Sequence, residues 1–226
     1  MFERYAIYYT PQGAFAEVGA AWMGWDVARS VAVDHAMVGD LDLAKLTRTP
    51  RKYGLHGTIK PPFFLRNGTD AVALEAAISA LSQTLSPVML EGLEVTCLGR
   101  IVTLTPCGDQ TGLAQLAAEV VTRLDNFRAP PLEQELAKRR KKSLSPEQDQ
   151  HLRDWGYPYV LDQFRFHMTL TGWTEQPEVA RDLAAAHFAP YLSDPVRIDS
   201  LTLVGQNENG MFGEIARYPL GGNVLV

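Results

Sequence analysis

Two strand-like segments of this chain repeat one local pattern, and this repeat constrains the fold more than any other feature. One segment reads LHGTI at residues 55–59, and the other reads FHMTL at residues 166–170. Side chains of a β-strand alternate between the two faces of its sheet. Each segment therefore predicts a strand with apolar residues on one face and a histidine with a threonine on the other.

The flanking residues extend both patterns. In the stretch QFRFHMTLTGW at residues 163–173, one predicted face is apolar and the other polar, with Phe164, Phe166, Met168 and Leu170 on the first and Arg165, His167, Thr169 and Thr171 on the second. In the first stretch, Leu55 and Ile59 mark the core face, and the opposite face carries His56, Thr58 and Lys60. Each strand should thus present an imidazole, a hydroxyl and a cation together.

The rest of the chain predicts strands and helices in irregular alternation. Apolar spacing and turn residues indicate strands at 5–9, 88–95 and 100–106, helices at 14–22, 70–85, 112–124 and 177–187, a helical turn at 39–46, and a terminal hairpin of 197–205 and 211–220 around Asn209-Gly210. The order of helices, histidine strand and hairpin recurs roughly twice. We therefore expect an α+β fold of two similar lobes.

We expect residues 1–226 to form a single bilobal domain with one unusual segment. Residues 129–155 are polar and charged, with Ser145 as a helix cap and Pro146 at the first helical position. This segment is predicted to be a helical connector or a lid. The last residues, 221–226, are expected to form a loose tail.

Composition excludes several classes of function. A formal net charge of −5 disfavours long-range, non-specific attraction to nucleic acid. No apolar run approaches the roughly 18 residues of a membrane span, and the first residues lack the pattern of a secretory leader. With only Cys97 and Cys107 in the chain, we expect a cytoplasmic protein without a membrane partner.

The paired histidine and threonine residues suit phosphate ester chemistry. Two imidazoles can divide the roles of general base and general acid near neutral pH. Threonine hydroxyls can donate hydrogen bonds to the non-bridging phosphate oxygens, and Lys60 or Arg165 could stabilise charge in the transition state. This scheme uses no metal and no cofactor.

At this point the sequence resembles the 2H phosphoesterase superfamily, which is defined by two His-x-Thr/Ser motifs on strands of two pseudo-symmetric lobes. The stretches WGYPYV at 155–160 and FRFHMTLTG at 164–172, with YAIYY at 5–9, resemble its branch of phosphonate metabolism proteins. The resemblance covers nearly the whole chain.

The resemblance implies a 2H phosphoesterase or RNA ligase-like fold, in which two lobes, each an antiparallel sheet with flanking helices, face each other across an active-site cleft. It makes His56 and His167 the catalytic pair and Thr58 and Thr169 the phosphate-binding residues. It also implies a cyclic phosphodiesterase acting on a small partner, a cyclic nucleotide or ribose phosphate, in phosphonate metabolism. The resemblance does not tell which histidine acts as the acid, and it does not give the oligomeric state.

Other residues have two interpretations each. Five tyrosines could line the cleft and stack on a base or ribose, although such aromatic residues usually lie in the core: Tyr5, Tyr8, Tyr9, Tyr157 and Tyr159. Arg51 and Lys52 are an entrance clamp or ordinary loop charges. The basic run at 138–142 is an RNA-binding strip or a solvated helix face, and its flanking glutamates favour the solvated face.

Three rival functions remain open at this stage. A metallohydrolase would use His56 and His167 as ligands, but the expected supporting carboxylates are missing from the motifs. A non-catalytic phosphate-binding protein would keep the cleft without turnover. An RNA-end processing enzyme, acting on 2′,3′-cyclic or 2′,5′-linked phosphodiesters, would need a continuous basic surface lined with aromatic residues.

Overall fold

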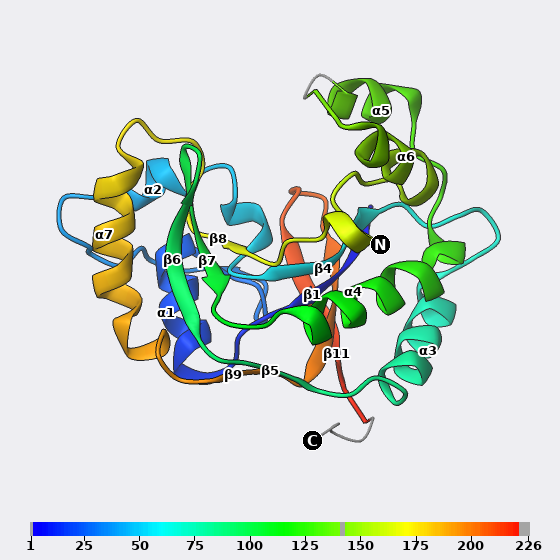
Figure 1. The fold of residues 1–226 in the computed structure, drawn as a ribbon, viewed down its shortest axis with the longest axis horizontal. Coiled ribbons are helices and arrows are strands. Elements are labelled where there is room, and N and C mark those ends of the chain that lie inside the picture. The colour runs from blue at the N-terminus through cyan, green and yellow to red at the C-terminus, as the bar shows by residue number, and fades with distance from the viewer. Residues whose placement is uncertain (1, 141–142, 222–226) are drawn as a thin grey trace.

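A seven-stranded antiparallel sheet forms the centre of the computed structural model, which describes residues 2–140 and 143–221 (Figure 1). In spatial order its strands are β11 (Phe212–Pro219), β10 (Ser200–Gln206), β1 (Tyr5–Tyr9), β4 (Gly57–Phe63), β8 (Met168–Thr169), β7 (Ile101–Pro106) and β6 (Leu93–Leu98). The predicted first strand, the strand near 100–106 and the terminal hairpin are confirmed.

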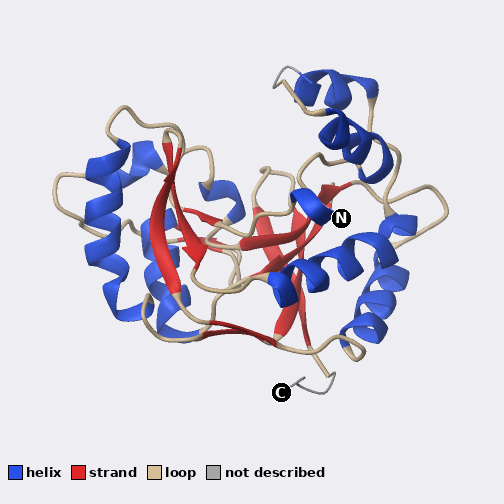
Figure 2. Ribbon diagram, in the orientation of Figure 1, coloured by secondary structure: helices blue, strands red, loops and turns tan. Residues whose placement is uncertain are grey.

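The sheet consists of two parts that meet at one point. Strands β1, β4, β10 and β11 form the first lobe, and β6, β7 and β8 form the second (Figure 2). Between β4 and β8 the only paired residues described are Gly57 and Met168. The α+β class and the two lobes predicted from sequence are therefore confirmed, and a single residue pair between β4 and β8 joins the lobes into one sheet.

Two helices cover the first lobe. Helix α3 (Ala71–Ser82) contacts β10 and β11, and helix α4 (Thr111–Arg123) contacts β4. Asp70, the first residue of the helix predicted at 70–85, caps α3 by accepting a hydrogen bond from the backbone nitrogen of Ala73. The helices bury apolar residues at helical spacing, which are Leu74, Ile78 and Leu81 in α3 and Leu113, Leu116, Val120 and Val121 in α4.

The second lobe is covered by helices from both ends of the chain. Helix α7 (Pro177–Phe188) packs on β6 and β7, and α1 (Gly13–Met23) and α2 (Leu43–Leu46) lie beside it (Figure 1). The rings of Trp22 in α1 and Phe188 in α7 have centroids 5.3 Å apart. Because β1 belongs to the first lobe and α1 to the second, the chain crosses between the lobes directly after β1.

Short elements complete the fold. They are the paired strands β2 (Trp25–Asp26) and β3 (Val31–Ala32), the paired strands β5 (Val88–Leu90) and β9 (Val196–Ile198), and the 3-10 turns η1 (Arg51–Tyr53), η2 (Asp125–Phe127), η3 (Leu161–Gln163) and η4 (Ala189–Tyr191). In the part of the chain that the structure describes, no helix is long and apolar enough to cross a membrane.

The polar segment forms a pair of helices that stands beside the first lobe. Helices α5 (Glu133–Arg140) and α6 (Pro146–Trp155) contact each other (Figure 1). Ser145 and Gln148 form a capping box at the start of α6, with Pro146 in the first turn, so the predicted break and cap are confirmed. The predicted lid role stays a prediction.

The second histidine strand is much shorter than its sequence predicts. Of residues 163–173, only Met168 and Thr169 form strand β8. The backbone nitrogens of Leu170 and Thr171 both bond to the carbonyl of Val102, which ends the regular ladder. Alternation still holds in the middle of the segment, where Phe166, Met168 and Leu170 are buried. The predicted tail lies outside the described residues, apart from Gly221.

Candidate active site

The two motifs meet in one pocket. His56, Thr58, His167 and Thr169 all line a cavity of about 420 Å³, a size that suits a small-molecule ligand. His56 lies just before β4, and His167 lies just before β8, the strand that pairs with β4. The pairing of these two strands thus brings together residues that are far apart in sequence.

Both imidazoles are oriented by the same kind of hydrogen bond. The Nδ1 atom of His56 lies 3.0 Å from the carbonyl oxygen of Gly54, and that of His167 lies 2.8 Å from the carbonyl oxygen of Arg165. A carbonyl oxygen can only accept, so each Nδ1 carries the hydrogen. In the neutral ring each Nε2 is then left with its lone pair, ready to accept a proton.

His56 is held more closely than its partner. Its Nε2 atom lies 3.1 Å from Oγ1 of Thr58, which can donate a hydrogen bond to it. Its ring stacks on the buried ring of Tyr8, with centroids 4.0 Å apart, and a second tyrosine, Tyr53, lies at 5.7 Å. These contacts fix the ring plane.

The environment of His56 favours the neutral imidazole. The pKa of His56 is lowered to about 4, mainly because the ring is buried; the hydrogen bond to Gly54 opposes this shift, and the nearby His167 adds to it. At pH 7 the neutral form of His56 therefore dominates, and its Nε2 can act as a base.

A close contact between the motifs sets their separation. Gly57, between His56 and Thr58, lies against the ring of Phe166, the residue before His167, and a Cβ atom at position 57 would overlap that ring. Phe166 is itself buried. Glycine at position 57 thus allows the two histidine segments to approach each other closely.

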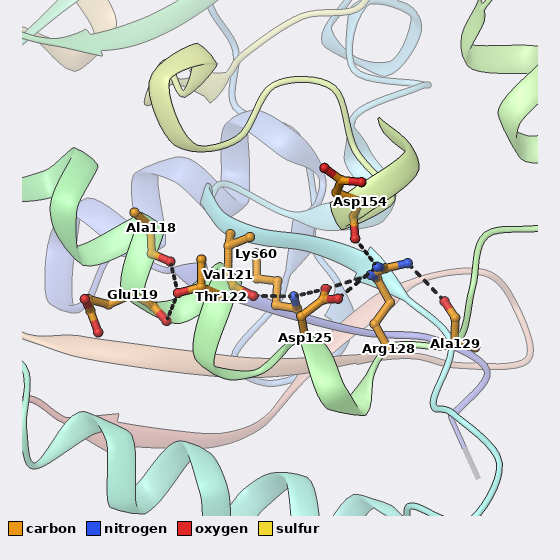
Figure 3. Close-up of polar contacts among 9 residues, drawn as sticks. All are labelled: Lys60, Ala118, Glu119, Val121, Thr122, Asp125, Arg128, Ala129 and Asp154. Atoms are coloured by element: carbon orange, nitrogen blue, oxygen red, sulfur yellow. Dashed lines mark hydrogen bonds and ion pairs between the residues drawn. The ribbon is translucent and has the colours of Figure 1, made fainter. Parts of the chain in front are cut away.

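Lys60 does not belong to the pocket, so its predicted place beside His56 is wrong. Its side chain is buried, and Nζ donates to the carbonyl of Val121 at 3.0 Å and to Asp125 at 3.2 Å (Figure 3). Asp125 is also held by Arg128. The reason is a bulge in β4, where Tyr8 pairs with Thr58 but Ile7 pairs with Lys60, which breaks the strict alternation of side chains.

The buried position of Lys60 also changes its ionisation. Burial lowers the pKa of Lys60 to about 8, although the neighbouring Asp125 opposes the shift. Lys60 links β4 to α4 through its hydrogen bond to Val121 and to η2 through its ion pair with Asp125, so its role is structural.

Arg165 and Tyr159 lie in a second cavity next to the first. This cavity, of about 270 Å³, shares Thr58, Pro61, Tyr157 and His167 with the pocket of the two histidines. Tyr159 is 39% exposed. Tyr8 lines neither cavity, because it is fully buried behind His56.

Sequence reasoning missed several residues of the main pocket. These are Arg4, Tyr53, Arg139 and Trp173, whereas Tyr157, one of the tyrosines considered for the cleft, does line the pocket. Arg139 belongs to the basic run, for which the solvated interpretation was favoured. Its guanidinium carbon lies 4.6 Å from the centroid of the Tyr157 ring, a contact between α5 and the loop after α6 that no local pattern reveals.

The other predicted charges have structural contacts. Arg51 donates hydrogen bonds to the carbonyls of Met23 and Ala44 and to Oγ1 of Thr47, so it supports its loop. Lys52 lies over the Tyr53 ring at 4.8 Å. The side chain of Lys138 and residues 141–142 lie outside the described part of the chain. Within that part, no group of three or more His, Cys, Asp or Glu residues is placed to hold a metal ion.

Comparison with known proteins gives one family and two long relatives. The family model described as "Protein of unknown function (DUF1045)" matches residues 58–213. The ribose 1,5-bisphosphate phosphokinase PhnN of Janthinobacterium sp. (strain Marseille) is 34% identical over 231 residues, which cover 97% of this chain and 51% of that protein. The protein of the same name from Laribacter hongkongensis (strain HLHK9) is 32% identical over 228 residues, covering 95% and 51%. The chain thus spans about half the length of these relatives.

Distant likenesses in fold come from solved structures. The E. coli LigT structure in apo form aligns with a TM-score of 0.48 and 14% identity, covering 96% of this chain and 97% of that chain. The LigT structure with NADP+ aligns with a TM-score of 0.46 and 15% identity, covering 98% and 99%. A structure described as a phosphoesterase aligns with a TM-score of 0.44 and 17% identity, covering 97% and 99%.

Proposed function

This chain belongs to the DUF1045 family, and we propose that it is a metal-independent phosphodiesterase of the 2H type that opens a small cyclic phosphodiester. One observation carries the proposal above all others. Two histidines line one pocket, each with Nδ1 bonded to a backbone carbonyl, so that in the neutral ring each Nε2 carries the lone pair that proton transfer needs. Two threonines of matching position line the same pocket.

In the proposed mechanism the two histidines have different roles. The neutral Nε2 of His56 accepts a proton from water as the water oxygen forms a bond to phosphorus. The P–O bond on the opposite side breaks, and its oxygen takes a proton from Nε2 of protonated His167. The reaction consumes one water, and the two histidines return to their starting states by exchanging protons with solvent.

The threonines and the orientation of the rings complete the scheme. Hydroxyls of Thr58 and Thr169 donate hydrogen bonds to the non-bridging oxygens, where charge builds up during attack. Thr58 must turn its hydroxyl from His56 to the phosphate when substrate binds, which frees the lone pair of Nε2. The backbone carbonyls of Gly54 and Arg165 keep both rings in the productive tautomer.

The two relatives support a ribose phosphate as the substrate skeleton. Both are named for a kinase of ribose 1,5-bisphosphate and are about twice as long as the region matched here. This sequence has no GxxxxGK[ST] motif of a P-loop kinase. We therefore propose that the region of these relatives that matches this chain opens a phosphodiester. This step would produce or process the phosphorylated sugar on which such a kinase acts.

The test is ring opening in the presence of EDTA. The panel comprises ribose 1,2-cyclic phosphates, 2′,3′-cyclic nucleotides and a short RNA with a 2′,3′-cyclic end, each followed by detection of the new phosphate monoester. We expect the wild type to open a cyclic ribose phosphate. We expect His56→Ala and His167→Ala each to reduce kcat/KM by about 100-fold or more, because each removes one proton-transfer group.

His151→Ala is the matched control, because His151 lies in α6 and lines neither cavity. Turnover near the wild-type rate in either pocket-histidine variant would rule out the paired scheme. Loss of wild-type activity in EDTA, with recovery on adding Zn²⁺, would favour the metallohydrolase instead. Exclusive activity on the RNA would favour RNA-end processing.

A further inference from the structure

Helices α5 and α6, together called the arm, provide one wall of the pocket of the two histidines. Among the described residues the two helices pack on each other, and neither packs extensively on a strand (Figure 1). Even so, Arg139 of α5 lines this pocket, and Tyr157, which follows α6, lines both cavities. The guanidinium carbon of Arg139 lies 4.6 Å from the centroid of the Tyr157 ring, so the two side chains form one surface. The position of the arm therefore determines the shape of this wall.

One side chain contacts the chain both where it enters the arm and where it leaves it. Arg128 directly precedes the polar segment 129–155. Its Nη1 donates a hydrogen bond of 3.3 Å to the carbonyl of Ala129, and its Nη2 donates one of 2.7 Å to the carbonyl of Asp154 (Figure 3). A Cβ atom at Gly156, the residue that caps α6, would lie 3.1 Å from Nη1 of Arg128. The guanidinium thus joins the two ends of the segment.

The contact with Asp154 is one that a helix end favours. The last four carbonyls of an α-helix have no partner within the helix, and they form the negative end of its dipole. Asp154 lies in the last turn of α6. Arg128 supplies a hydrogen-bond donor and a positive charge at this end, so the contact stabilises the place where the arm returns to the lobe.

Arg128 is itself fixed to the first lobe. Its Nε and Nη2 donate hydrogen bonds of 2.8 Å and 2.9 Å to the two carboxylate oxygens of Asp125 (Figure 3). The side chain of Arg128 is only 11% exposed. Although burial raises the pKa of Asp125, the hydrogen bonds and charges of Arg128 and Lys60 hold it below its usual value. A guanidinium bonded twice to an ionised carboxylate has a fixed orientation.

The arm has other contacts besides Arg128. Side-chain contacts tie α6 to the η3 turn, among them a hydrogen bond of 3.2 Å from Gln148 to Gln163. Loss of the Arg128 contacts should therefore loosen the arm without releasing it. Because Gly156 packs on Arg128 and directly precedes Tyr157, the loosening should be felt at the pocket.

We propose that Arg128 is a positioning residue for the reaction: it holds both ends of the arm so that Arg139 and Tyr157 complete the wall of the pocket around the substrate. This proposal rests on the proposed function and adds a residue that lines neither cavity. The two histidines and the two threonines of the pocket lie on or beside β4 and β8, not on the arm. A loosened arm should therefore weaken substrate binding and leave the chemical step largely intact.

The test is the separate measurement of KM and kcat with ribose 1,2-cyclic phosphate. Arg128→Lys keeps a positive charge beside Asp125, but an ammonium group cannot reproduce the planar fork that also reaches Asp154. We expect this variant to raise KM about 10-fold and to keep kcat within about threefold, because binding is lost equally in the ground state and the transition state. A KM equal to that of the wild type would overturn the proposal.

Gly156→Ala tests the same contact from the arm. The φ angle of Gly156 is 72°, which favours glycine, and the added methyl group would press on the guanidinium of Arg128. We expect this variant to raise KM about threefold or more, again with little change in kcat. Unchanged KM in this variant would also contradict the role of Arg128.

Arg217→Gln is the matched control. Like Arg128, Arg217 is largely buried, pairs with a carboxylate, that of Glu214 at 2.8 Å, and donates to a backbone carbonyl, that of Thr10 at 3.0 Å. It lies in β11, away from the arm, and lines neither cavity. We expect its KM to equal that of the wild type. An equal rise of KM in Arg217→Gln and Arg128→Lys would show a general loss of stability and overturn the proposal.

Hydrogen exchange of the free proteins separates the arm from the chemistry. We expect the amides of α5 and α6 to exchange about 10-fold faster in Arg128→Lys than in the wild type or Arg217→Gln. If the wild type opens no cyclic phosphate, the proposed function fails, and faster exchange confined to α5 and α6 would still support the hold of Arg128 on the arm. Equal exchange of these helices in all three proteins would overturn it.

Discussion

At the scale of single residues, the protonation state of His56 assigns the roles of base and acid in the proposed reaction. Its ring is enclosed by Tyr8, Tyr53 and the backbone, and it faces a second histidine rather than a carboxylate. Such surroundings disfavour the charged imidazolium. They suit a group that must begin the reaction neutral, which leaves the role of acid to His167.

The first prediction is therefore the position of one limb of the pH–rate profile. With the pKa of His56 lowered to about 4, the neutral base is lost only as the pH falls through that value. We expect kcat/KM to decrease about tenfold per pH unit below about pH 4 and to show no corresponding loss between pH 5 and 6.5. Steady-state kinetics in buffers of constant ionic strength would measure this. A decrease in kcat/KM that begins near pH 6.5 as the pH falls would contradict the assignment of His56 as the neutral base.

Lys60 provides the second prediction at this scale. Because it is buried against Val121 and Asp125 and does not reach the pocket, we expect Lys60→Met to keep kcat/KM within about threefold. Lys60→Ala should lower the free energy of unfolding by about 2 kcal/mol or more, since it leaves a cavity and removes one partner of Asp125. Urea denaturation and kinetics of both variants test this. A loss of about 100-fold in kcat/KM for folded Lys60→Met would return Lys60 to the site.

At the scale of elements, the sequence predicted much of what the structure contains. The periodicity of 70–85, 112–124 and 177–187 found the long helices because each has an apolar face on the sheet. The His-x-Thr repeats identified the residues that line one pocket. What could not be predicted depends on pairing between strands and on contacts distant in sequence, namely the bulge that turns Lys60 away, the short β8, and the presence of Arg4 and Arg139 in the pocket.

The contact between Gly57 and Phe166 gives the third prediction. A methyl group at position 57 would overlap the Phe166 ring and push the two histidine segments apart. We expect Gly57→Ala to lower kcat about 10-fold or more, because small displacements of catalytic groups have large effects on rate.

The matching second-site change is Phe166→Leu, which makes room for the new methyl group. The double variant should regain part of the activity lost by Gly57→Ala alone. Equal activity of Gly57→Ala and wild type would show that the segments tolerate the wider separation. Circular dichroism of each variant would establish that the fold is kept.

At the scale of the whole molecule, the lobes are interleaved along the chain. Strand β1 belongs to the first lobe, α1 to the second and β4 again to the first, and the C-terminal hairpin returns to β1. Neither half of the sequence contains all strands of one lobe. We therefore expect the lobes to unfold in one cooperative transition.

The fourth prediction concerns how this stability depends on pH. The unfolded chain binds a proton at each histidine near pH 6.5, whereas burial lowers the pKa of folded His56 to about 4 and lowers that of His187. Between these values the unfolded state binds more protons, so the free energy of unfolding decreases as the pH falls from 6.5 to 4. Urea denaturation at several pH values measures the slope, and His56→Ala should reduce it. An unchanged slope in that variant would contradict the buried, neutral ring.

The single residue pair that joins the lobes, Gly57 and Met168, has a consequence for selectivity by size. Because β4 and β8 pair at Gly57 and Met168, each directly after a histidine, we expect the distance between the two imidazoles to change little when a ligand binds. The pocket should therefore select ligands by their width. A small, rigid mimic of a pentacoordinate phosphate should bind well. A wider analogue with the same charge should bind weakly because it does not fit between the two histidines.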